Sequence, residues 1–143
     1  MAEWLEHTEL LDVINHGETF RYRIAGREIE RIFNTPMHGR MLEDVFSGDV
    51  LSFKLRIFRR SVETRSVILS NDTLERGGES LRKYERILIP LSENGLDVDM
   101  LFGCTYPMYF RNESISMLDP NLKIIAEDFF EDPFEACHAL IKA

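Results

Sequence analysis

The side chains that most often perform catalysis or bind metal ions are few and scattered in this sequence. None of the histidines and cysteines forms a set at metal-ligand spacing, and two cysteines are too few for a disulfide framework. There is no serine-elbow motif, no glycine-rich phosphate loop and no dinucleotide-binding fingerprint. The sequence therefore predicts a protein that is not an enzyme, with no catalytic residue, metal site or cofactor. The scattered residues are His7, His16, His38, His138, Cys104 and Cys137.

Two aspartates come closest to a paired-carboxylate site. Asp97 and Asp99 are two residues apart in a segment that we expect to be a strand, so their side chains share one face. Such a pair can serve acid–base chemistry, but charged side chains on strands are usually exposed to solvent. We therefore prefer a solvated face for both residues.

One basic region stands out in an otherwise acidic chain. Lys54, Arg56, Arg59, Arg60 and Arg65 lie in or next to a long segment with helical spacing. A solvated helix face is the simpler interpretation. The alternative is a docking patch for an acidic partner or an anionic ligand, which charge complementarity would favour. Arg56, Arg59 and Arg60 are on this basis candidate interface residues.

The composition limits the classes of partner. The chain has 143 residues, of which 44% are hydrophobic and 29% charged, which is ordinary for one globular domain. Its net charge of −8 argues against binding to nucleic acid or anionic membrane, because both need a positive surface. No apolar run approaches the ~18 residues of a membrane span, and the acidic N-terminus lacks a signal-peptide pattern. We expect a cytoplasmic protein without nucleic-acid or membrane partners.

The clearest structural signal is a β-hairpin over residues 84–103. Two alternating apolar runs flank Asn94-Gly95, a pair that favours a tight turn with positive φ. Folding the chain at this turn predicts one apolar face toward the core and an outer face for contacts, with Tyr84, Leu88 and Leu101 as candidate interface residues. The expected pairs on the core face are Leu91 with Val98, Ile89 with Met100 and Ile87 with Phe102.

The segments before this hairpin predict more strands and a layer of helices. Residues 9–25 fit a second hairpin better than a helix, because Phe20, Tyr22 and Ile24 alternate with arginines. Short helices are expected over residues 27–33 and 39–46, and a long helix over 50–63. A third strand is expected over 64–70, followed by a polar loop over 71–80.

The C-terminal segment has a different pattern. Asp119-Pro120 looks like a helix start, and apolar residues from Leu122 to Phe130 follow helical spacing. A second helix start, with a capping box, is expected at Asp132. These signals predict a domain over residues 1–110 and a C-terminal helical extension over 111–143 packed on it.

Three sequence stretches resemble the PAS domain superfamily, and within it the family of small, mostly stand-alone alphaproteobacterial PAS-type proteins. They are FRYRIAGREI, HGRMLEDVF and YERILIPLSENGLDVDMLFG, and the resemblance covers about residues 10–106. The expected order of elements is also that of a PAS domain: two strands, short helices, a long helix and three strands. The matching residues are Arg23, Gly26, Gly39, Arg40, Leu42, Glu85, Arg86, Pro90, Leu91, Ser92, Gly95, Val98 and Gly103.

The resemblance implies an α+β fold, a five-stranded antiparallel sheet with helices over one face. It also implies a non-enzymatic cytoplasmic signalling module that acts through protein–protein interaction, as a homodimer and with an unidentified signalling protein. The alternative is a sensor that binds a small molecule or cofactor between sheet and helices, and an enzyme is a second, less favoured alternative. Fold alone does not decide between them.

The resemblance also suggests where a ligand would bind. His38 lies in the region that lines the pocket of ligand-holding PAS domains, and is the one candidate for a haem or metal ligand. A close-packed core remains the simpler interpretation of the apolar residues there, although methionines make a cavity more adaptable. The candidate pocket residues are Phe33, Met37, Met41, Phe46, Phe53, Ile57, Met100 and Phe102.

Overall fold

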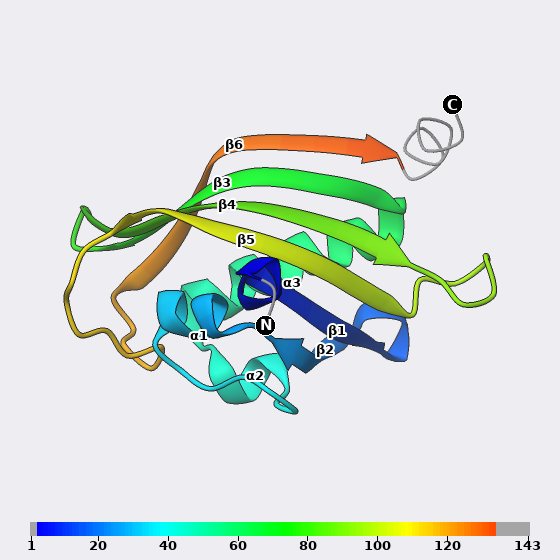
Figure 1. Ribbon diagram of the computed structural model, residues 1–143, viewed down its shortest axis with the longest axis horizontal. Coiled ribbons are helices and arrows are strands. Elements are labelled where there is room, and N and C mark those ends of the chain that lie inside the picture. Colours follow the sequence, from blue (N-terminus) through cyan, green and yellow to red (C-terminus); the bar gives the residue numbers. More distant parts are fainter. Residues whose placement is uncertain (1–2, 134–143) are drawn as a thin grey trace.

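A computed structural model describes residues 3–133, which form one six-stranded antiparallel sheet with helices over one face (Figure 1). The strand order across the sheet is β2-β1-β5-β4-β3-β6. The strands are β1 (Thr8–Ile14), β2 (Thr19–Ala25), β3 (Ser66–Arg76), β4 (Glu79–Leu91), β5 (Met100–Phe110) and β6 (Leu122–Pro133). The helices are α1 (Arg27–Phe33), α2 (Leu42–Val45) and α3 (Gly48–Thr64), with 3-10 turns η1 (Glu3–His7) and η2 (Asn15–Gly17).

The α+β class is confirmed, and the predicted elements of the N-terminal half are present. β1 pairs with β2 as the expected hairpin, α1 has the expected bounds, and α2 is shorter than expected. Phe20 and Tyr22 point into the core, whereas Ile24 at the end of the strand is 50% exposed. None of the helices in residues 3–133 is long and apolar enough to cross a membrane.

The C-terminal prediction is wrong between residues 122 and 133, where the chain forms a sixth strand instead of a helix. β6 pairs with β3 along its whole length. Leu122 and Ile124 are 1% and 5% exposed, whereas Lys123 and Ile125 are exposed. Burial therefore alternates with the period of two that a strand requires. This pairing satisfies the hydrogen-bonding groups on one edge of β3. The rest of the second predicted helix, from residue 134, lies outside the described residues.

The polar loop predicted over residues 71–80 is also wrong. β3 continues to Arg76, and the chain turns at Gly77-Gly78 directly into β4. Both glycines have positive φ, 60° and 80°, as tight hairpin turns require. Asp72 and Thr73 were expected in the loop because they are polar, but both are buried in the sheet.

The hairpin of β4 and β5 is present with a different register and a longer loop. The observed pairs are Leu91 with Met100, Ile89 with Phe102 and Ile87 with Cys104, two residues from the predicted register. The loop over residues 92–99 is held by Asn94, whose Oδ1 accepts hydrogen bonds from two backbone N–H groups at 2.8 and 2.9 Å.

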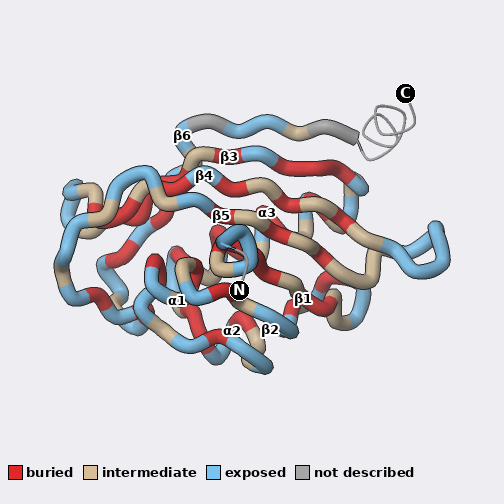
Figure 2. Tube along the Cα trace, in the orientation of Figure 1, coloured by how far each residue is buried: buried red, intermediate tan, exposed pale blue. Residues whose placement is uncertain are grey.

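The two faces of this hairpin are the reverse of the prediction. Tyr84, Leu88 and Leu101 are 1%, 0% and 0% exposed and belong to the core beneath the helices, so their assignment to the outer face is wrong. Met100 and Phe102 lie on the opposite face and do not border the helices. Figure 2 shows the alternation of buried and less buried residues along β4 and β5.

The core lies between the inner face of the sheet and the helices. Aromatic rings pack edge to face there, with Phe33 5.3 Å from Phe46 and 5.7 Å from Tyr84, centroid to centroid. The segment that links β5 to β6 contributes Ile115 and Met117, both 4% exposed. The core is therefore complete without any residue from the outer face of the sheet.

Candidate functional site

The outer face of the sheet carries two rows of apolar side chains that run across the strands. Residues paired in adjacent antiparallel strands present their side chains on the same face, so the register defines each row. The first row crosses β6, β3, β4 and β5, and the second crosses β4, β5, β1 and β2. We name these eight residues the outer apolar patch. Its members are Phe130, Leu69, Ile87 and Cys104 in the first row, and Ile89, Phe102, Leu10 and Ile24 in the second.

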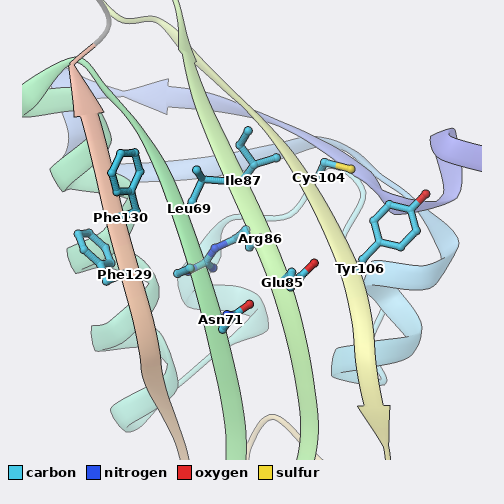
Figure 3. Close-up of a pocket in the computed structure, with 10 residues that line it drawn as sticks. Leu69, Asn71, Glu85, Arg86, Ile87, Cys104, Tyr106, Phe129 and Phe130 are labelled. Carbon is cyan, nitrogen blue, oxygen red and sulfur yellow. The ribbon is translucent and has the colours of Figure 1, made fainter. Parts of the chain in front are cut away.

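The outer apolar patch is open to solvent. Leu69 is 42% exposed, Ile24 50% and Phe130 58%. A shallow groove with a volume of about 520 Å³ runs along the first row, with Tyr106 and Phe129 also on its walls. Figure 3 shows its side chains on β6, β3, β4 and β5, with the helices on the far side of the sheet. The groove thus offers mainly apolar contacts, with the exposed side chain of Glu85 also on its wall.

Cys104 lines this groove but is not an activated nucleophile. Burial and the nearby negative charge of Glu9 raise the pKa of its thiol. A thiol must ionise to react quickly. Cys104 therefore contributes a small apolar surface to the patch.

A buried charged cluster lies behind the patch, on the inner face. Four charged side chains from four elements meet there: Glu9 of β1, Lys54 of α3, Asp72 of β3 and Arg86 of β4. Each residue is at most 2% exposed. Isolated charges are rarely buried because removing them from water is costly. This cluster is therefore the most unusual chemistry in the described residues.

One close ion pair lies at the centre of the cluster. Arg86 Nη2 is 2.8 Å from Asp72 Oδ2, and both side chains are almost fully excluded from solvent. Arg86 Nη2 also donates a hydrogen bond to Ser70 Oγ at 3.4 Å. The attraction of Asp72 raises the pKa of Arg86 against the opposing effect of burial, so the guanidinium stays charged.

A glycine makes room for the acid of β1. Gly103 pairs with Glu9, and a Cβ at Gly103 would lie 2.7 Å from Glu9 Oε1. Any side chain here would displace the Glu9 carboxylate. Burial raises the pKa of Glu9, and the attraction of Lys54 and Arg86 opposes this rise.

Lys54 is enclosed by aromatic rings. Its Nζ lies 4.1 Å from the ring centre of Phe33 and 5.3 to 5.8 Å from those of Phe46, Phe58 and Tyr84. The ring faces attract the ammonium. Burial, together with repulsion by Arg86, nevertheless lowers the pKa of Lys54 to about 7.

The predicted pocket residues fall into two groups. Five of the eight are core residues with at most 4% exposure, and Met41 is half-buried. Met100 and Phe102 lie on the outer face, as described above. His38 is exposed, and no group of side chains in residues 3–133 is arranged to hold a metal ion. The five core residues are Phe33, Met37, Phe46, Phe53 and Ile57.

The predicted basic patch is divided among internal contacts. Arg59 donates hydrogen bonds to the carbonyl oxygens of Gly17 and Glu18 at 2.9 and 2.6 Å. Arg60 forms an ion pair with Glu131 of β6 at 3.0 Å. Arg56 is exposed, with its guanidinium 5.5 Å from the ring centre of Phe53. Two of the three candidate interface arginines therefore hold parts of this chain together.

Asp97 and Asp99 do not form a paired-carboxylate site. Asp99 Oδ2 accepts a hydrogen bond from the backbone N–H of Glu93 at 3.1 Å. Asp97 accepts one from Asn94 at 3.4 Å through its side chain. Both carboxylates stabilise the loop over residues 92–99.

Sequence reasoning missed both the outer apolar patch and the buried charged cluster. The patch could be found only with the strand register, because its residues come from all six strands. Gly103 was noticed in the sequence, but its role beside Glu9 depends on the pairing of β1 with β5. Comparisons of the chain with protein-family models, curated proteins and solved structures gave no match.

Proposed function

We propose that this protein is a non-enzymatic PAS-type interaction module of cytoplasmic signalling, which acts through the outer apolar patch and forms a homodimer there. The order of elements supports the PAS resemblance: β1 and β2, then three helices, then β3, β4 and β5. β6 is an addition to the five strands that the resemblance implies, and it extends the surface of the patch with Phe130.

The observation that carries the proposal is the exposed apolar surface across several strands. Single apolar residues are common on protein surfaces, but a continuous patch on a sheet face usually marks a contact. Leu69 and Phe130 are register partners on adjacent strands, and each is 42% or more exposed. Burying such side chains against a second surface would contribute about 25 cal/mol per Å² of apolar area.

The test introduces a charge into the patch and measures the mass of the protein in solution. Leu69→Asp should shift a dimer to a monomer in sedimentation equilibrium runs between 5 and 200 μM, on the order of the concentrations used for weak dimers. Leu96→Asp is the matched control, because Leu96 is 68% exposed in the loop over residues 92–99, outside the patch. A wild-type protein that is monomeric throughout, or equal effects of both variants, would contradict the proposal.

A second candidate function is the sensing of a small polar ligand between sheet and helices. Its support is the number of buried polar atoms without a hydrogen-bond partner in the described residues, among them Glu9 Oε1, Tyr22 OH and Tyr84 OH. Buried polar groups usually have partners. Native mass spectrometry of protein purified gently from its own cells tests this function. A bound small molecule would favour it, and a mass equal to that of the bare chain would count against it.

A further inference from the structure

Lys54 and Glu9 are the two members of the buried charged cluster without an ion-pair partner. Arg86 and Asp72 neutralise each other at 2.8 Å. Among residues 3–133, no carboxylate is close enough to Lys54 Nζ for an ion pair, and its contacts there are aromatic rings. Glu9 Oε1 has no hydrogen-bond partner among the described residues. A buried lysine in this position readily loses its proton, and a buried carboxyl group readily keeps one.

We propose that Glu9 and Lys54 form a buried pair whose members each exchange a proton with water, so that the packing of α3 against the sheet depends on pH near neutrality. Lys54 lies in the middle of α3, and Glu9 lies on β1 of the sheet. As the pH rises, the Lys54 ammonium releases its proton to water and becomes an uncharged amine. As the pH falls, the Glu9 carboxylate takes a proton from water. Either event changes the charge that is buried between α3 and the sheet, and this links folding to pH.

The titratable groups around the pair come from every element of the sheet that faces α3. Asp72 and Arg86 form their own ion pair at 2.8 Å, and their charges also act on Lys54, while Arg86 attracts Glu9. The phenols of Tyr22 and Tyr84 stay protonated, because burial raises the pKa of both well above the usual value. The nearby helices contribute neutral rings. The acids of β6 with described side chains have other partners, Glu131 with Arg60 and Glu127 with Thr73. The groups that face the pair are Tyr22 of β2, Asp72 of β3, and Tyr84 and Arg86 of β4. Cys104 of β5 lies on the outer face of the sheet, where the charge of Glu9 still raises the pKa of its thiol.

The direction of the pH effect follows from proton counting. Lys54 has a pKa of about 7 in the fold and an ordinary value of 10.5 in the unfolded chain. Between these values the unfolded chain holds more protons, so stability rises with pH. The pKa of Glu9 is raised above its ordinary value of 4.5 in the fold. From 4.5 up to that raised value the folded protein holds more protons, so stability falls as the pH rises.

The first experiment observes Lys54 in the wild-type protein. The chain has four lysines, so ¹³C-lysine labelling gives a simple spectrum of Cε resonances. We expect one resonance to titrate near pH 7, and its protons to show contacts with the ring of Phe33. The proposal is overturned if that resonance titrates together with the other lysines near pH 10.5.

The second experiment measures urea unfolding from pH 4.5 to 10 for the wild type, Lys54→Met and Glu9→Gln. Relative to Lys54→Met, the unfolding equilibrium constant of the wild type should fall by up to about tenfold per pH unit above pH 7. Lys83→Met is the matched control, because Lys83 is half-buried and lies 3.8 Å from Glu127. Parallel curves for the wild type and Lys54→Met would overturn the proposal. Glu9→Gln should remove the dependence on the acidic side.

Discussion

The Arg86–Asp72 ion pair should be strongly cooperative, and a double-mutant cycle measures this. Both side chains are at most 1% exposed, and their charged atoms are 2.8 Å apart. At an effective dielectric constant of about 20, two unit charges at this distance attract by about 6 kcal/mol, against about 1.5 kcal/mol in water. Desolvation offsets most of this attraction, so the net value of the pair is small. Breaking the pair on one side, however, leaves a buried charge without compensation.

We expect Arg86→Met to lower the free energy of unfolding by about 3–5 kcal/mol, because it leaves Asp72 buried and unpaired. Asp72→Asn should cost less, since Glu9 still faces the remaining guanidinium. The free energy of unfolding of the double variant should lie within about 1–2 kcal/mol of that of the wild type, because burying two neutral side chains has a small desolvation cost. The coupling energy between the two sites is then about 3 kcal/mol or more.

The assay is urea unfolding followed by far-UV circular dichroism at pH 8.5, above the Lys54 pKa of about 7. The Arg111–Glu79 pair is the matched control, because its atoms are 2.9 Å apart but its side chains are 42% and 68% exposed. An exposed pair should give a coupling energy of about 0.2–1 kcal/mol. Equal coupling energies for the two pairs would refute the reasoning, since distance and charge are matched while burial differs. Both control variants are made in a Glu113→Gln background, because Arg111 also forms an ion pair with Glu113 at 3.0 Å.

Two further predictions concern glycines. Gly103→Ala should lower the free energy of unfolding by about 1–3 kcal/mol, because its Cβ would lie 2.7 Å from Glu9 Oε1. The loss should be smaller in a Glu9→Ala background; an unchanged loss in urea unfolding would mean that the close approach is not the cause. Gly95→Ala should cost about 1–2 kcal/mol through backbone conformation alone, since φ is +75° and nothing lies within 4 Å of the new Cβ. Gly95→Asn should lower the free energy of unfolding by less in the same urea assay, because asparagine adopts positive φ more readily than alanine.

Local signals were sufficient for the elements whose partners are near in sequence. The alternation of Phe20 and Tyr22 with arginines predicted β2, and the turn before it predicted the pairing with β1. The helix over Arg27–Phe33 was predicted from Ile29, Ile32 and Phe33, all of which are buried. In each case the residues that decide the structure lie within a few positions of one another.

The face of β4 could not be predicted because both of its faces are apolar. Ile87 and Ile89 alternate with Leu88 and Tyr84, so periodicity gives two equivalent faces. Arg86 appeared to settle the choice, since charged residues are usually exposed. Its partner Asp72 lies on the neighbouring strand, in a segment predicted as a loop, and the pair becomes visible only with the register of β3 and β4.

The C-terminal strand shows a similar limit. Leu122, Ile125 and Phe129 fit a helix, whereas Leu122 and Ile124 with Ala126 fit a strand. The long edge of β3 decides between them. A strand paired with this edge satisfies its backbone N–H and C=O groups, and an open edge leaves them without partners in the sheet. That edge becomes visible only once β3 is known to extend to Arg76.

The apolar residues on the outer face of the sheet are not needed for the core, and this supports an interface there. Tyr84, Leu88 and Leu101 fill the core, so Leu69 and Phe130 on the other face contribute little to the stability of one chain. A chain with polar residues at these two positions would fold with similar stability and would have a lower risk of unwanted association. Leu69→Asp should therefore change the free energy of unfolding of the monomer by no more than about 0.5 kcal/mol, while it abolishes the dimer. A large loss of monomer stability would show that Leu69 serves the fold, and the contact would then have to be sought elsewhere.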